Sequence, residues 1–271
     1  MMNQNEPAYQ ELDMMVGTAR VSARVAGQGQ PLVLFHSLLA DNSSFDPLAT
    51  LLATTHKVIV LNLPGFGSSG AVEGGLEDVA DRVGAALQQL KLEQAPIFIG
   101  NGFGGFVALL TAIRFPAIAQ RLVLADCGAA FSEPGRAAFR GMSAAAAEKG
   151  LAGVANVAML RLFSADFQQA NPALIEVRKE RFLQTDVRTF HAACAALAQL
   201  DLRPLLSQVT VPVLVMVGEF DEATPPPMSR ELAAGLPDAR LKVLTGCAHV
   251  PQLQEPQRFY DEIIDFIDGR S

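Results

Sequence analysis

Two side chains capable of acid–base chemistry follow apolar runs late in the chain. Asp221 lies in VGEFDEATPP, and His249 lies in TGCAHVPQLQEP. A histidine oriented by a carboxylate can take a proton from a reacting group and return it later in the reaction. Asp221 taken alone fits a helix cap, and His249 taken alone fits an ordinary loop histidine. Because each comes directly after a strand-like run, the two together favour a catalytic pair.

A glycine-rich turn precedes both residues in the chain. Residues 97–105 read IFIGNGFGG, which matches the spacing G-x-S-x-G of a nucleophile turn with Gly102 at the serine position. The sharp step from strand to helix needs small neighbours, and Gly100, Gly104 and Gly105 provide them. Glycine cannot be acylated, so covalent chemistry at position 102 is excluded.

The elements that position these residues read as alternating strands and helices. Mostly unbroken apolar runs predict strands at 19–26, 31–36, 57–63, 95–100, 121–126, 212–218 and 240–246. Apolar residues at helical spacing predict helices at 76–92, 103–115, 227–235 and 256–268. This alternation predicts an α/β fold with a mostly parallel, doubly wound sheet.

One long segment interrupts the alternation. From about Phe131 to Leu206 the chain contains helical sequence without a convincing strand. We expect an α/β core formed by residues 1–130 and 206–271, and a helical cap formed by residues 131–205 above the carboxyl ends of the strands. The alternative is an ordinary helical layer on one face of the sheet.

The segments FHSLL, DLRPLL, GEFDEATPP and CAHVPQLQEP resemble those of the α/β-hydrolase fold family, and most closely its β-ketoadipate (3-oxoadipate) enol-lactone hydrolase-like group. The resemblance covers nearly the whole chain. It implies that Asp221 orients His249, that His249 is the general base, and that the backbone N–H groups of Leu38 and Phe103 form an oxyanion hole. Gly102 is the departure from the family pattern, since a nucleophilic serine is expected there.

Several interpretations of Gly102 stay open at this point. A serine was removed by engineering, or a natural enzyme uses His249 and Asp221 without a covalent intermediate. Such an enzyme would hydrolyse a small ester or enol-lactone, or would be a cofactor-free lyase, isomerase or oxygenase. A small-molecule receptor that retains only the pocket is another class. Glycine also relieves strain at the turn, which costs about 1–3 kcal/mol for a residue with a side chain.

The expected substrate is a small acyl or cyclic molecule. A lactone that bears a carboxylate would need a guanidinium partner, and the cap supplies Arg161, Arg178, Arg181 and Arg188. Of these, Arg161 is the candidate for substrate contact. The other candidate substrate-binding residues are Ser37, Phe131 and Phe163.

Composition limits the remaining classes of function. The net charge is -7 and no Lys/Arg cluster is present, so no nucleic-acid partner is expected. The apolar runs are too short to span a membrane, and the N-terminus lacks the features of a secretory signal, so we expect a cytoplasmic location. Cys127, Cys194 and Cys247 read as buried free thiols. No metal-ligand spacing is found and no cofactor is expected, while the oligomeric state does not follow from the sequence.

Overall fold

Eight strands form a single mixed sheet. The computed structural model describes residues 7–270, and its strands pair in the order β1-β2-β4-β3-β5-β6-β7-β8. β1 pairs antiparallel with β2 and β2 antiparallel with β4, while the other neighbours are parallel. The strand bounds are β1 Gln10–Val16, β2 Ala19–Ala26, β3 Pro31–Phe35, β4 Lys57–Leu61, β5 Ile97–Asn101, β6 Arg121–Ala125, β7 Val213–Gly218 and β8 Ala239–Leu244.

The unbroken apolar strands lie where both faces of the sheet are covered. Every residue of β3, β5 and β7 is buried, which explains why these strands show no alternation of apolar and polar residues. β8, at the edge, exposes three consecutive residues from Arg240 to Lys242. β1 was not predicted, because its polar and apolar residues alternate only weakly. It forms a hairpin with β2 through the two-residue turn Gly17–Thr18, where Gly17 has φ 61°.

Helices cover the two faces of the sheet, as doubly wound topology requires. On one face, α1 (Asp46–Leu52) and α11 (Pro256–Ile267) pack against Leu32, Leu34 and Ile97. On the other face, α2 (Leu76–Gln88), α3 (Phe103–Arg114) and α9 (Pro226–Gly235) pack against Val33, Phe35 and Phe98. The alternate side chains of β3 therefore belong to two separate apolar cores.

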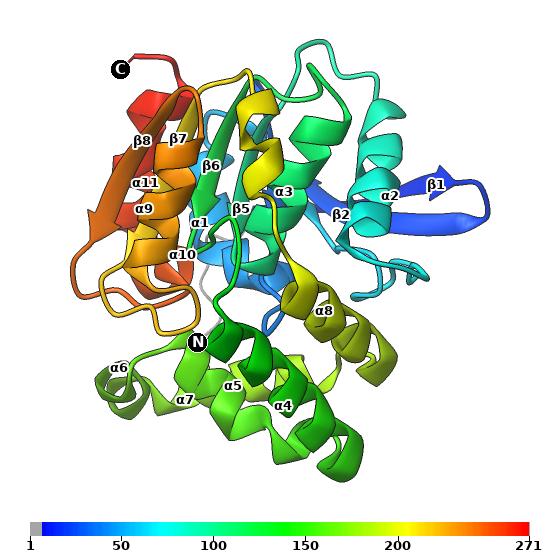
Figure 1. Ribbon diagram of the computed structural model, residues 1–271. Helices are drawn as coiled ribbons and strands as arrows, with labels where there is room; N and C mark the ends of the chain where they lie inside the picture. Colours follow the sequence, from blue (N-terminus) through cyan, green and yellow to red (C-terminus); the bar gives the residue numbers. More distant parts are fainter. Residues whose placement is uncertain (1–6, 271) are drawn as a thin grey trace.

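Five helices lie between β6 and β7 in the chain. They are α4 Glu133–Lys149, α5 Ala155–Leu162, α6 Ala165–Ala170, α7 Pro172–Leu183 and α8 Val187–Gln199. Figure 1 shows them gathered beyond one end of the sheet, where the chain leaves β6. This helical insert matches the strand-free segment that the sequence predicts. Its treatment as a separate cap of residues 131–205 stays a prediction.

The remaining expectations concern the N-terminus, membranes and thiols. Residues 1–6, on which the expected absence of a signal partly depends, lie outside the described residues. Within residues 7–270, no helix is long and apolar enough to cross a bilayer. Cys127, Cys194 and Cys247 are all free and buried, as predicted. Burial raises the pKa of the Cys127 thiol, which therefore stays protonated at neutral pH.

Candidate active site

The turn between β5 and α3 holds Gly102 in a conformation that disfavours side chains. Its backbone has φ 55° and ψ -121°, and its N–H donates to the carbonyl of Ala125 at 2.9 Å. A Cβ atom placed on Gly102 would lie 2.6 Å from Ser37 Oγ and 2.7 Å from His249 Nε2. The turn therefore points the empty position of residue 102 directly at the histidine.

The neighbouring glycines allow the helix to approach the sheet, as the sequence predicts. A Cβ on Gly104 would lie 2.1 Å from the carbonyl oxygen of Phe35, and one on Gly105 would lie 2.8 Å from Cys127 Sγ. Real Cβ atoms do not come this close to a backbone oxygen or to a buried sulfur, so α3 can start at this distance from Phe35 and Cys127 only with glycine at these two positions.

His249 and Asp221 form a buried pair, although they are 28 residues apart in the chain. His249 Nδ1 lies 2.9 Å from Asp221 Oδ2, and the two residues are 5% and 3% exposed. Asp221 also accepts hydrogen bonds from the N–H groups of Ala223 and Thr224 and from the Thr224 hydroxyl. Burial alone would raise the pKa of Asp221, but His249 and Thr224 outweigh it and hold that pKa below its usual value. The carboxylate is therefore ionised at neutral pH and accepts the Nδ1–H of His249.

A second buried carboxyl group supports this pair. Asp126 follows β6 at a positive φ of 52°, and its Oδ1 accepts the N–H of Gly218 at 2.8 Å. Burial, followed by the charge of Asp221, raises the pKa of Asp126 well above its ordinary value. Asp126 therefore keeps its proton to a higher pH than Asp221 does. Asn101 joins it to the histidine by donating to Asp126 Oδ2 at 3.3 Å and to the His249 carbonyl at 2.8 Å.

The loop after β3 brings a third polar group to the site. Ser37 is 2% exposed, and its Oγ lies 3.4 Å from His249 Nε2. His36 fixes this loop, because its Nδ1–H donates to the Ser37 carbonyl at 2.9 Å and its Nε2 accepts the N–H of Leu63 at 3.2 Å. Burial lowers the pKa of His36, which keeps the ring neutral and suited to both contacts.

A small cavity joins these groups. Its volume is about 30 Å³, enough for a water molecule and well below the size of a typical ligand pocket. It is lined from the core by Ser37, Leu38, Leu39, Gly102, Phe103, Phe106, Ala223, Thr224 and His249, and from the helical segment by Phe131, Phe139, Met142, Arg161 and Leu197. The cavity therefore has to widen before it can admit a substrate larger than a water molecule.

A larger open cleft adjoins this cavity. Its volume is about 590 Å³, and it shares Phe131, Arg161 and Ala223 with the cavity. Arg161 makes no hydrogen bond or ion pair with any other residue in 7–270. A half-buried, unpaired guanidinium thus stands between the cleft and His249.

Other residues expected to contact substrate lie elsewhere. Phe163 is fully buried and stacks on Phe167 at 5.2 Å, outside the cavity lining. Arg178 and Arg181 pair with Asp41, and Arg188 pairs with Asp186 on the surface. The geometry therefore selects Arg161 from the four arginines as the group that reaches the cavity.

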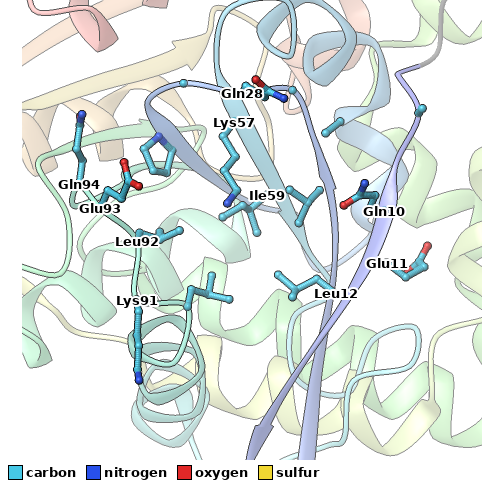
Figure 2. A pocket seen from close by; sticks show the side chains of 17 residues that line it. Gln10, Glu11, Leu12, Gln28, Lys57, Ile59, Lys91, Leu92, Glu93 and Gln94 are labelled. Atoms are coloured by element: carbon cyan, nitrogen blue, oxygen red, sulfur yellow. The ribbon is translucent and has the colours of Figure 1, made fainter.

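A larger cavity lies at the amino ends of the parallel strands β3 and β4. It measures about 860 Å³, and Figure 2 shows Lys57 near its centre. Its lining includes Pro31 and Lys57, which begin β3 and β4, whereas ligands of parallel α/β sheets bind beyond the carboxyl ends of the strands. None of the predicted site residues borders it. We therefore place the candidate active site at the smaller cavity.

One group of metal-capable side chains occurs in the described part of the chain. The ligand atoms of Asp126, Asp221 and His249 lie within 4.8 Å of one another. These atoms already take part in the Asp221–His249 contact and accept hydrogen bonds from backbone N–H groups and from Asn101. The three side chains therefore belong to one hydrogen-bonded acid–base network.

A glycine-rich turn after β5, an acid after β7 and a histidine after β8 at one edge of a mostly parallel sheet define the α/β-hydrolase class of proteins. The sequence pattern of the alpha/beta hydrolase family matches residues 32–262. The chain therefore belongs to this family, and the fold predicted from the sequence is confirmed.

Individual relatives are distant but nearly full length. The chain is 27% identical over 233 residues to 3-oxoadipate enol-lactonase 2 of Acinetobacter baylyi, covering 85% of this chain and 86% of that protein. It is also 27% identical over 264 residues to a pimeloyl-(acyl-carrier protein) methyl ester esterase of Vibrio cholerae, covering 90% and 96%. The crystal structure of the enol-lactonase from Burkholderia xenovorans superposes with a TM-score of 0.88 at 25% identity, covering 95% of this chain and 100% of that one.

Sequence reasoning missed three groups in this site. Asp126 reads as the end of an apolar run, Asn101 as part of the glycine-rich turn, and Thr224 as part of a proline-rich loop. Thr224 carried a usable signal, because a hydroxyl three residues after an acid commonly closes a local turn. Asp126 and Asn101 carried none, because their contacts are made across the sheet edge.

Proposed function

We propose that the protein hydrolyses small carboxylic esters or lactones, with His249 as the general base and acid and Asp221 as the carboxylate that orients it. The observation that carries this proposal is the buried Asp221–His249 contact of 2.9 Å, which leaves Nε2 facing the turn at Gly102. Nε2 takes the proton of the attacking oxygen and returns it to the leaving oxygen. The low pKa of Asp221 keeps its negative charge available to stabilise the imidazolium that forms.

The backbone N–H groups of Leu38 and Phe103 are the proposed oxyanion donors. Both residues line the cavity beside Gly102, and the Leu38 N–H donates to no acceptor within residues 7–270. Phe103 is the first residue of α3, so its N–H has no partner inside the helix. Unpaired donors in a buried cavity stabilise negative charge that develops on a carbonyl oxygen.

Gly102 is proposed to occupy the position that a nucleophilic serine has in this fold. No acyl group can be carried there, so the attacking oxygen belongs to water or to another hydroxyl group at the site. The pairing of an intact acid and base with an empty nucleophile position supports an enzyme more strongly than a receptor, since binding alone needs no oriented base.

The proposed substrates carry a carboxylate in addition to the ester. Arg161 is the unpaired cation at the entrance, and a carboxylate is the natural partner of a half-buried guanidinium. The resemblance to an enol-lactonase and to methyl ester esterases supports an ester or a lactone as the group that is cleaved.

The test is a matched pair of substrates. One substrate is the neutral p-nitrophenyl butyrate, and the other is the p-nitrophenyl hemiester of succinic acid, which carries a carboxylate. Both are assayed with the unaltered protein, with His249→Ala and with Arg161→Met. We expect His249→Ala to lower kcat/KM by about 10²–10⁴-fold on both, since this is the usual contribution of a general base. Arg161→Met should raise KM only for the hemiester, and Arg188→Met, at an exposed arginine, serves as its control.

Two results would count against the proposal. If the protein and Gly102→Ser both fail to turn over any ester or enol-lactone while a small ligand raises the melting temperature, the protein is a receptor. If turnover persists in His249→Ala, the acid–base assignment is wrong.

A further inference from the structure

Ser37 Oγ occupies the space that the side chain of residue 102 would need. A Cβ on Gly102 would lie 2.6 Å from Ser37 Oγ, which is closer than unbonded atoms can stand, and 3.1 Å from Ser37 Cβ, which is a tight contact. With glycine at position 102, the Ser37 hydroxyl therefore fits into the region in front of His249. The turn at Gly102 and the loop after β3 together therefore present a single side chain, that of Ser37, to His249.

Ser37 is also the hydroxyl within reach of the catalytic nitrogen. Its Oγ is 3.4 Å from His249 Nε2, across 212 residues of sequence, and no other hydroxyl in residues 7–270 lies within hydrogen-bond distance of that atom. Thr224 lies on the other side of the ring, 3.3 Å from Nδ1. Hydrogen bonds of this kind are often long in unliganded sites and shorten when substrate is bound.

The proposed oxyanion donors stand in the same relation to a nucleophile on the loop after β3 as to one on the β5–α3 turn. In the usual arrangement, one donor is the N–H of the residue that follows the nucleophile. Leu38 follows Ser37 just as Phe103 follows Gly102, and both line the same cavity. A nucleophile at Ser37 would therefore use the same two donors with their roles exchanged.

From this juxtaposition we infer that Ser37 is the nucleophile of the reaction, relocated from the β5–α3 turn to the β3 loop. The inference rests on the proposed ester or lactone hydrolysis. His249 Nε2 takes the proton of Ser37 Oγ while Oγ bonds to the carbonyl carbon. The bond from that carbon to the leaving oxygen then breaks, and the leaving oxygen takes the proton from Nε2.

The resulting ester of Ser37 is cleaved by the reverse sequence. Water gives a proton to His249 Nε2 and bonds to the acyl carbon, the bond from that carbon to Oγ breaks, and Oγ recovers the proton. The anchoring of the Ser37 carbonyl by the N–H of Ala40 and by His36 holds the loop still during both steps.

The test uses a fluorophosphonate probe and tryptic peptide mapping. Ser37 lies in the peptide of residues 25–57, whereas position 102 lies in the peptide of residues 92–114, which contains no serine. We expect one phosphonate on residues 25–57, assigned to Ser37 by fragmentation, and none in Ser37→Ala or His249→Ala. Ser44 lies in the same peptide, and its buried hydroxyl has no hydrogen-bond partner in residues 7–270. Ser44→Ala is therefore the control and should label like the unaltered protein.

Kinetics provide a second readout. Ser37→Ala should lower kcat/KM at least about 10²-fold, and the double variant with His249→Ala should be no slower than His249→Ala, because residues that act as one unit are not additive. Gly102→Ser combined with Ser37→Ala should regain activity and carry the label on residues 92–114, which shows that the fold and the base survive the change at Ser37.

The two proposals fail in different ways. If esters are hydrolysed with dependence on His249 but Ser37→Ala keeps its rate and residues 25–57 stay unlabelled, water attacks directly and the role of Ser37 is refuted. If no ester is turned over yet Ser37 is labelled with dependence on His249, the nucleophile assignment holds and the proposed substrate class is wrong. Absence of both turnover and label overturns both.

Discussion

The substitution Gly102→Ala tests whether the site has room for a side chain at position 102. At φ 55° and ψ -121°, a residue with a Cβ atom carries backbone strain of about 1–3 kcal/mol. The new methyl group would also stand 2.6 Å from Ser37 Oγ and 2.7 Å from His249 Nε2. The serine side chain can rotate away, but the histidine cannot move without lengthening its 2.9 Å contact with Asp221.

We therefore expect Gly102→Ala to lower the free energy of unfolding by about 2–4 kcal/mol in total, from the backbone strain together with overpacking. In a chain of this size the melting temperature should fall on the order of 10 °C. The measurement is urea unfolding followed by circular dichroism, supported by calorimetry.

Substitutions at two other glycines distinguish backbone strain from collision as the cause of the lost stability. Gly150 has φ 68° and ψ 176°, and a Cβ there would meet nothing within 4 Å, so Gly150→Ala reports backbone strain without collision. Gly141 lies inside α4 with equally open surroundings, and Gly141→Ala should stabilise the protein by about 0.5–1 kcal/mol. If Gly102→Ala proves no less stable than Gly150→Ala, the methyl group does not collide with Ser37 and His249, and our reasoning about the shared space fails.

One further prediction concerns the network around this site, and another concerns the contact of α7 with the loop after β3. Asp126→Asn retains an acceptor for the Gly218 N–H. Because the native pKa of Asp126 is raised, the unaltered protein should lose stability as pH rises from the unfolded pKa of about 3.9 toward the native pKa, by up to about 1.4 kcal/mol per pH unit. The free energy of unfolding of the variant, measured in urea, should therefore rise relative to that of the unaltered protein between pH 5 and pH 8, and an equal difference at both pH values would contradict this. Arg178→Met removes the partly buried contacts of α7 with Asp41 and Ser43 and should cost about 1–3 kcal/mol, with faster proteolysis in α4–α8. Arg188→Ala should change stability by less than about 0.5 kcal/mol, and equal effects of the two variants would show that the Arg178 contacts do not hold α7 to the loop after β3.

Much of the architecture was readable in advance. Strands buried on both faces need apolar residues at every position, so β3, β5 and β7 show as unbroken runs in the sequence. The carboxyl ends of parallel strands meet at one sheet edge, so Gly102, Asp221 and His249 could be placed together without coordinates. β1 and α1 were missed, because a partly exposed edge strand and a seven-residue helix leave weak periodic signals.

The sequence by itself determined the family, the order of turn, acid and histidine, and the absence of a hydroxyl at position 102. Only the tertiary structure decided which side chains act on one another there. It brought Ser37 Oγ within 3.4 Å of His249 Nε2, and its burial of Asp126 raised the pKa of that carboxyl group. It also left Arg161 unpaired, whereas Arg178 and Arg181 pair with Asp41. The physical reason is that strand and helix formation follow local periodicity, whereas side-chain direction, burial and charge depend on packing between segments far apart in the chain.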